Sequence, residues 1–156
     1  MFQDYFLALL EWWKINILLK TKPYNHLFKE GEIWWCSIGM NVGVEIFGKG
    51  PDFSRPVVIF KKFNADSFLG IPLTTQPKEG RWYAQINFGG KERKAILTQA
   101  RTFDAKRLIR KLSTLNPDGL YNLQIEFIQF YGPENLRPTP EELESGAVGN
   151  PNNLPH

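Results

Sequence analysis

Cysteine is almost absent from this chain of 156 residues, which contains only Cys36. A single cysteine excludes an internal disulfide framework and any zinc site built from several cysteines. Cys36 follows directly on the apolar residues Ile33, Trp34 and Trp35. We therefore expect a buried, unreactive thiol and no cysteine nucleophile.

Histidine is also scarce, with His26 near the start of the chain and His156 at its end. This pair does not favour a two-histidine ribonuclease mechanism or a Ser-His-acid triad. Carboxylates are scattered across the central region, among them those at positions 32, 45, 52, 66, 79 and 104. Since no close Asp/Glu pair recurs at strand ends, the sequence predicts neither a metal site nor another cofactor. Catalysis would have to use arginine, hydroxyl groups or isolated acids.

A long apolar run is missing as well. The stretch from Phe6 to Leu19 is interrupted by Glu11, Lys14 and Asn16, and a membrane span needs about 18 apolar residues. The first four residues also lack the basic start of a secretory signal. We expect a cytoplasmic protein that has no membrane partner.

The charges are unevenly distributed along the chain. Residues 1–132 hold 18 Lys and Arg against 12 Asp and Glu, whereas residues 133–156 hold one Arg and four Glu. A basic body fits a polyanionic partner, because phosphate contacts supply affinity that is independent of sequence. A solvated basic surface without a partner would have the same composition.

The chain divides into an N-terminal helical extension at 1–29, a domain at 30–132 and a flexible tail at 133–156. In the extension, apolar residues recur at helical spacing and predict an amphipathic helix over about 4–21, with an apolar stripe made of Phe6, Leu9, Leu10, Trp13 and Ile17. We expect this stripe to dock on the domain; binding a partner or a membrane surface is the alternative. The tail has five prolines and few large apolar residues.

The central region has the pattern of a mainly β domain. Runs rich in β-branched and aromatic residues occur at 33–38, 56–61, 68–74, 81–88 and 94–99, separated by turn residues. Closely spaced strands without long helices between them favour a barrel or sandwich. Two helices are predicted to follow: a short basic one over Ala105–Leu112, and a longer one from Asn116-Pro117-Asp118 to Gly132-Pro133.

Five short motifs succeed one another in this region: Gly31-Glu32-Ile33-Trp34-Trp35, Asn41 to Gly48, Arg55-Pro56-Val57-Val58-Ile59, Ile71 to Gln76, and Leu97 to Asp104. Each is weak alone, but their order and spacing resemble the MazF/PemK family of toxin-antitoxin endoribonucleases. The resemblance implies an SH3-like β-barrel with a C-terminal helix and a homodimer. It also implies a cognate antitoxin and metal-independent, sequence-specific cleavage of single-stranded RNA, with no action on DNA.

The resemblance also implies site residues. Arg55 matches the catalytic arginine of the family and Thr74 its catalytic threonine. The chemistry is reasonable in itself: when the 2′-hydroxyl of RNA attacks the adjacent phosphorus, a guanidinium can neutralise the phosphorane with bidentate bonds. A threonine hydroxyl can orient the phosphate or relay a proton. Glu45 matches an acidic loop position and is a third candidate, with a solvated loop carboxylate as the alternative.

Further RNA contacts are expected from Lys49, Phe53, Thr75, Gln76, Lys78 and Arg101. For Arg101, as for Gln99, a structural role that holds the strand to the barrel is the alternative. Phe47, Phe53 and Trp82 are candidates for stacking on unpaired bases, although Trp82 could instead pack in the core.

Two features depart from the best-known members of the family. The loop between Gly48 and Arg55 is longer, and Ile96 and Thr98 stand where some members have an arginine and an aspartate. The acid–base scheme of those members cannot operate here. Two rival functions stay open: a non-catalytic SH3-like binding module, which the long loop favours, and a gyrase-inhibiting toxin resembling CcdB, in which Arg55 and Thr74 would have no role.

Overall fold

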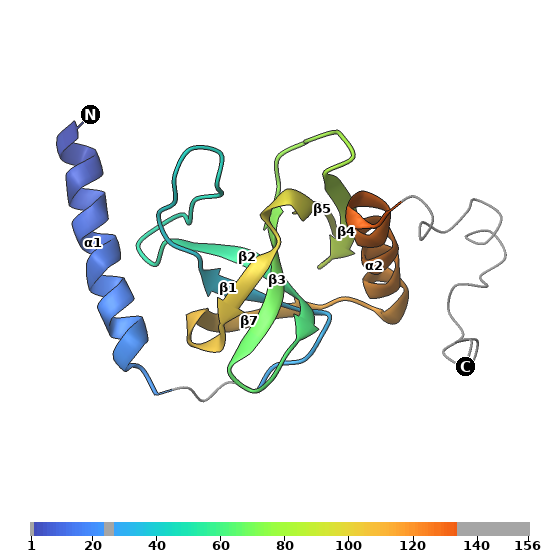
Figure 1. Cartoon of the computed structure of the whole chain (residues 1–156), viewed down its shortest axis with the longest axis horizontal. Coiled ribbons are helices and arrows are strands. Elements are labelled where there is room, and N and C mark those ends of the chain that lie inside the picture. The colour runs from blue at the N-terminus through green and yellow to red at the C-terminus, as the bar shows by residue number, and fades with distance from the viewer. Residues whose placement is uncertain (1, 24–26, 134–156) are drawn as a thin grey trace, which may run out of the picture.

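Seven strands and two helices occur in the residues that this computed structural model describes, 2–23 and 27–133 (Figure 1). The chain order is α1 (Phe2–Thr21), β1 (Glu32–Ser37), β2 (Ser54–Lys62), β3 (Ser67–Thr74), β4 (Tyr83–Phe88), β5 (Lys91–Ile96), β6 (Arg101–Asp104), β7 (Leu108–Thr114) and α2 (Pro117–Tyr131). Short 3₁₀ turns at Leu97–Gln99 and Ala105–Arg107 flank β6. The predicted mainly β class is confirmed. The tail predicted at 133–156 lies, from residue 134 onward, outside the described residues.

The strands form one antiparallel sheet in the order β4-β5-β3-β2-β1-β7, and β6 pairs with the first half of β3. The hydrogen-bonded ladder does not close on itself, so a fully closed barrel is not what forms. The chain bridges the gap covalently, because β6 pairs with β3, β7 pairs with β1, and the turn at 105–107 joins them. Register shifts between Ile59 and Lys61, and along β1, mark the bulges at which the sheet bends.

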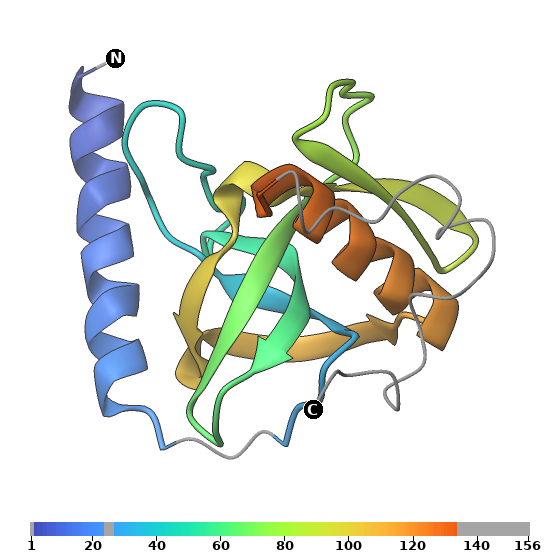
Figure 2. The ribbon, with the colours of Figure 1, turned by 45° about the vertical axis from the view of Figure 1, so that its right-hand side comes forward.

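Helix α2 lies against β4 and covers one of the two apolar clusters of the sheet (Figure 2). Its start is set as predicted: the Asn116 side chain accepts a hydrogen bond from Gly119 N at 2.8 Å, and Pro117 occupies the first turn. Leu123 is fully buried, and the Phe127 ring lies 4.6 Å from the Phe60 ring of β2. The cluster beneath α2 therefore joins the helix to the strands that carry the candidate site.

The prediction of a helix over Ala105–Leu112 is wrong, because a short turn and a strand form there. Asp104 does cap a turn there, accepting a hydrogen bond from Lys106 N at 2.8 Å, but the turn ends at Arg107 and β7 begins at Leu108. β7 pairs with β1, and Leu108 is fully buried opposite Cys36. Pairing with an otherwise open strand edge satisfies backbone groups of both strands, which outweighs the local helical propensity.

The N-terminal helix forms as predicted, but the side chains that it buries are not those of the predicted stripe, of which only Phe6 and Leu9 line a cavity with the domain. The predicted stripe is exposed, from 39% at Leu10 to 64% at Trp13. The partly buried side chains are instead Ala8, Trp12, Ile15, Asn16 and Leu19. The Trp12 ring covers Gly39, whose position would leave no room for a Cβ atom, and lies 5.7 Å from the Phe53 ring. Apolar residues surround most of α1, so their spacing could not identify the docking face. Within the described chain, no helix is long and apolar enough to cross a membrane.

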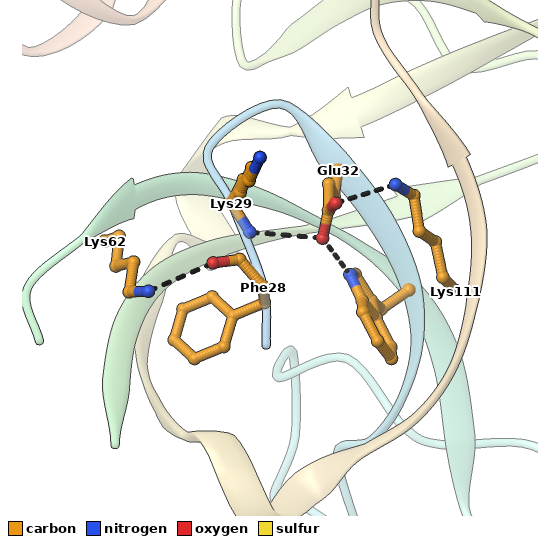
Figure 3. A network of polar contacts seen from close by, with 6 residues as sticks. Phe28, Lys29, Glu32, Lys62 and Lys111 are labelled. Carbon is orange, nitrogen blue, oxygen red and sulfur yellow. Dashed lines mark hydrogen bonds and ion pairs between the residues drawn. The ribbon is translucent and has the colours of Figure 1, made fainter. Parts of the chain in front are cut away.

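A buried glutamate ties the start of the domain to the sheet (Figure 3). Glu32 accepts hydrogen bonds from Lys111 Nζ at 2.7 Å, Trp34 Nε1 at 2.9 Å and Lys29 N at 3.1 Å. Burial raises the pKa of Glu32, but the three donors outweigh burial and hold the pKa below its ordinary value of 4.5. Glu32 therefore acts in stability, as an anchor between β1, β7 and the segment before β1.

Candidate active site

Arg55 is held at the beginning of β2, where it pairs with Cys36 of β1. Its guanidinium is partly buried and donates from Nε to the carbonyl oxygen of Phe47. Burial lowers the pKa of Arg55, yet an arginine side chain stays protonated in proteins. In the described part of the chain, no carboxylate lies within ion-pair distance of it. Arg55 therefore presents a charge without an acidic partner.

Thr74 ends β3, the strand that neighbours β2. The β2–β3 ladder ends at Val57 and Pro72, and Arg55 and Thr74 each lie two residues beyond that pair on these neighbouring strands. Thr74 is 8% exposed, and its Oγ1 accepts a hydrogen bond from Gln76 N at 3.2 Å. Because that bond uses the oxygen as an acceptor, the hydroxyl proton is left to donate elsewhere.

Both residues line a cavity of about 620 Å³. Its walls come from the loop before β2, the end of β3, the segment that leads into β4, and the turn after β5. The lining contains two cations, Arg55 and Lys78, and no carboxylate; the other residues are Val44, Ile46, Thr74, Gln76, Trp82, Tyr83, Ile96, Thr98 and Gln99. A positive cavity with hydroxyl and amide groups suits an anionic ligand such as a phosphodiester.

Gln99 shapes one wall of this cavity. Its Oε1 accepts from Ile46 N at 3.0 Å and its Nε2 donates to Val44 O at 3.3 Å. The Asn41 side chain donates to Ile46 O at 2.6 Å and so binds the same loop from its other end. Gln99 therefore holds the loop before β2, whereas the sequence analysis expected it to hold the strand to the barrel.

Of the six predicted RNA contacts, Gln76 and Lys78 line the cavity and the other four do not. Lys49 lines a separate cavity of about 330 Å³ beside Arg110. Phe53 packs against Trp12 of α1. Thr75, the first residue after β3, is exposed and is absent from the lining.

Glu45 and Arg101 also lie outside the lining. The Glu45 carboxylate accepts from Val42 N at 3.1 Å within its own loop. Arg101 donates to Ile38 O at 2.8 Å and stacks at 4.7 Å on the Phe103 ring, and burial lowers its pKa. These contacts give Arg101 a structural role.

Three cavity residues were missed or undervalued by the sequence analysis. Trp82 is 46% exposed and faces the cavity, so packing in the core is not its role. Tyr83 and Thr98 were not predicted as contacts; Tyr83 is the first residue of β4, whereas the sequence predicted a strand that began at Arg81. In the described residues, no group of three or more His, Cys, Asp and Glu is placed to hold a metal ion.

The curved sheet, the covering helix and the basic cavity define a small, mainly β domain with one candidate site. Residues 29–131 match the sequence profile of the PemK-like, MazF-like toxins of type II toxin-antitoxin systems. The chain belongs to this toxin family. Comparison with curated protein sequences gives no match.

Solved structures share the fold at low sequence identity. A mycobacterial endoribonuclease in complex with its cognate antitoxin superposes with a TM-score of 0.55 at 13% identity, over 73% of this chain and 100% of that one. MazF from Deinococcus radiodurans superposes with a TM-score of 0.54 at 15% identity, over 70% of this chain and 100% of that one. The MazE-MazF structure from the same organism superposes with a TM-score of 0.52 at 14% identity, over 69% of this chain and 98% of that one. Such identities support the fold alone.

Proposed function

We propose that this toxin cleaves single-stranded RNA by attack of a 2′-hydroxyl on the neighbouring phosphorus, without a metal ion. The observation that carries the proposal is the position of Arg55 and Thr74. They lie on the neighbouring strands β2 and β3 and line one cavity whose lining contains no carboxylate. Family membership and the solved endoribonucleases with this fold support the same activity.

Arg55 would bind the scissile phosphate. In the reaction the 2′-oxygen bonds to phosphorus, the bond from phosphorus to the 5′-oxygen breaks, and the proton released by the 2′-hydroxyl is balanced by one gained at the leaving oxygen. Negative charge accumulates on the phosphorane oxygens. Arg55 can stabilise that charge without first giving up an ion pair, because no acidic partner lies within reach among the described residues.

Thr74 would orient the phosphate. Its Oγ1 already accepts from Gln76 N, which favours donation of its proton to a phosphate oxygen over abstraction of the 2′-proton. Glu45 is a proposal of lesser weight, since its carboxylate is bonded to Val42 N and lies outside the lining. Trp82 and Tyr83 offer rings on which bases can stack.

The long loop before Arg55 does not displace the arginine from the cavity. Lys49 and Ser54 form a bridge across this loop, with two backbone hydrogen bonds of 2.9 and 3.0 Å. The extra residues therefore fold back on themselves and line the separate cavity near Arg110. This removes the feature that favoured a non-catalytic module.

The test is cleavage of a long RNA in excess EDTA, with mapping of the cut ends. We expect products with a 2′,3′-cyclic phosphate, or its opened form, and a 5′-hydroxyl, and no cleavage of DNA. Arg55→Ala should lower the rate by roughly 10²–10³, as the loss of one donor to a developing oxyanion does. Arg55→Lys should recover only part of the loss, because a point charge does not reproduce the guanidinium fork.

Thr74→Ala should also lose activity, whereas Thr75→Ala is the matched control and should keep it. Activity that survives both Arg55→Ala and Thr74→Ala would overturn the proposal. So would cleavage that stops in EDTA and returns with magnesium. A folded protein that binds RNA without cutting it would support the binding module, and inhibition of gyrase would support the CcdB-like alternative.

We further propose that the toxin acts in the cytoplasm as a homodimer and is neutralised by a cognate antitoxin. The mycobacterial relative was solved with its antitoxin and the Deinococcus radiodurans relative as MazE-MazF. Exposed apolar side chains on α2, Ile128 at 41% and Tyr131 at 52%, offer surface that pairing would cover. Sedimentation at micromolar concentration should show dimers; monomers alone would remove the two-subunit arrangement.

A further inference from the structure

A second, smaller cavity of about 250 Å³ lies beside the first, and Tyr83 lines both. Its other lining residues are Arg81, which precedes β4, and Glu126, Gln129 and Phe130 of α2. It therefore combines two aromatic rings with a cation, a carboxylate and an amide. Apart from Tyr83, none of the residues that line this cavity has a part in the chemistry proposed for Arg55 and Thr74.

The charged groups of this cavity are not paired with each other. Glu126 is partly buried, yet no hydrogen bond or ion pair is formed by its carboxylate among the residues described. Burial raises its pKa, and the positive charge of Lys94 opposes that rise. Lys94 itself is engaged by Glu92 at 3.5 Å and by Gln85 at 3.3 Å. A partly desolvated carboxylate without donors gains from a ligand that supplies N–H groups.

Arg81, which is exposed, supplies hydrogen-bond donors and a positive charge to the same cavity. Its guanidinium lies over the Phe130 ring, 5.9 Å from the ring centre. No carboxylate of the described chain pairs with it within 4.0 Å. Its donors are therefore available to acceptor atoms of a ligand that enters between Phe130 and Tyr83.

We propose that this cavity binds a guanine base of the RNA whose scissile phosphate lies at Arg55. This inference rests on the proposed function and adds a determinant of its sequence preference. Guanine presents two acceptors, O6 and N7, to an arginine on one edge, and two donors, N1–H and the 2-amino group, to a carboxylate on the other. Its ring can stack on the aromatic side chains of the cavity.

The other bases match the cavity less well. Adenine has an amino donor beside N7, so Arg81 would face a donor. Cytosine can donate to Glu126 through its amino group, but it lacks the acceptor pair of the purine edge. Uracil has a single ring N–H for the carboxylate. Only guanine satisfies Arg81 and Glu126 together.

Binding of short oligonucleotides tests the inference without depending on cleavage. The probe is UUUGUUU RNA, with UUUAUUU and the inosine analogue as comparisons, and the protein is the full chain carrying Thr74→Ala. We expect the guanosine oligonucleotide to bind about 5- to 150-fold more tightly than the adenosine one, the discrimination that a bidentate side-chain contact to a base provides. Inosine, which lacks the 2-amino group, should fall between them.

Adding Glu126→Gln should remove most of this preference, and adding Asp118→Asn is the matched control. Asp118 is an exposed carboxylate at the other end of α2, so its loss changes the net charge equally and should leave the preference intact. Equal binding of the three oligonucleotides, or a preference that persists in Glu126→Gln, would overturn the inference.

The two proposals can fail separately. Cleavage of long RNA by the unaltered protein, without guanosine enriched near the cut, would leave the proposed function standing and remove the guanine site. Guanosine-dependent binding by a protein that cuts no RNA would support the guanine site and remove the proposed activity.

Discussion

Replacing Trp12 by alanine should loosen α1 from the domain. The ring covers Gly39, lies 5.7 Å from the Phe53 ring and has the Arg107 guanidinium 5.7 Å above it. Truncating a fully buried tryptophan to alanine costs about 3–5 kcal/mol. Trp12 is only partly buried, so we expect on the order of 2–3 kcal/mol, a lower figure on the same scale.

Trp13 provides the matched control, because it is the next residue and is 64% exposed. Its replacement by alanine should change stability by no more than about 0.5 kcal/mol, as is usual for surface sites. In a chain of this size, 1 kcal/mol corresponds to roughly 2–4 °C in Tm. The expected losses are therefore roughly 4–12 °C for Trp12→Ala and at most about 2 °C for Trp13→Ala.

Thermal unfolding followed by circular dichroism gives the comparison, and amide hydrogen exchange gives a second readout. Since α1 touches the domain through few side chains, it could undock before the sheet melts. In that case Trp12→Ala would speed exchange in α1 while the sheet stays protected. Deletion of residues 1–24 should likewise lower Tm. If Trp13→Ala matched or exceeded Trp12→Ala in both readouts, the docking face described for α1 would be refuted.

Two further predictions concern the buried carboxylate of Glu32 and the partly buried carboxylate of Glu126. Glu32→Gln should lower stability at pH 7 by about 1–3 kcal/mol, the value of hydrogen bonds to a charged group. Because the pKa of Glu32 is lowered in the folded state, its contribution to stability is present above pH 4.5 and is lost as the pH falls through the folded-state pKa. Denaturant unfolding in which the difference between the unaltered and the Glu32→Gln proteins did not change with pH would contradict this prediction. Glu126→Gln should do the reverse and raise Tm at pH 7, since burial raises the pKa of Glu126 and disfavours its charge. That gain should vanish below pH 4.5, where the carboxyl is protonated in both states, and a lower Tm at pH 7 would show that Glu126 has a partner.

Much of the fold could be predicted from local patterns. The runs rich in β-branched and aromatic residues, and the turn residues between them, located β1 to β5, although β5 begins and ends three residues earlier than expected. The turn residues Gly89 and Gly90 join β4 to β5 with positive φ values of 58° and 69°. Asn116 and Pro117 marked the start of α2 correctly. These signals act within a few residues, so they survive whatever the tertiary context is.

Contacts between distant segments decided the rest. Residues 108–114 became a strand because the free edge of β1 needed a partner, and no local pattern contains that information. The face that α1 uses was set by the space above Gly39, since apolar residues lie on several sides of the helix. In both cases local propensity was too weak to choose between alternatives that differ only in packing.

The candidate site shows the same division. The sequence by itself determined which residue types were available, an arginine before a buried strand and a threonine at a strand end, with few histidines or paired acids to compete. Only the tertiary structure decided that Arg55 and Thr74 line one cavity from neighbouring strands, that Glu45 bonds within its own loop, and that Arg81 and α2 form a second cavity beside the first. The physical reason is that strand register and helix packing are long-range properties, fixed by burial of a shared core.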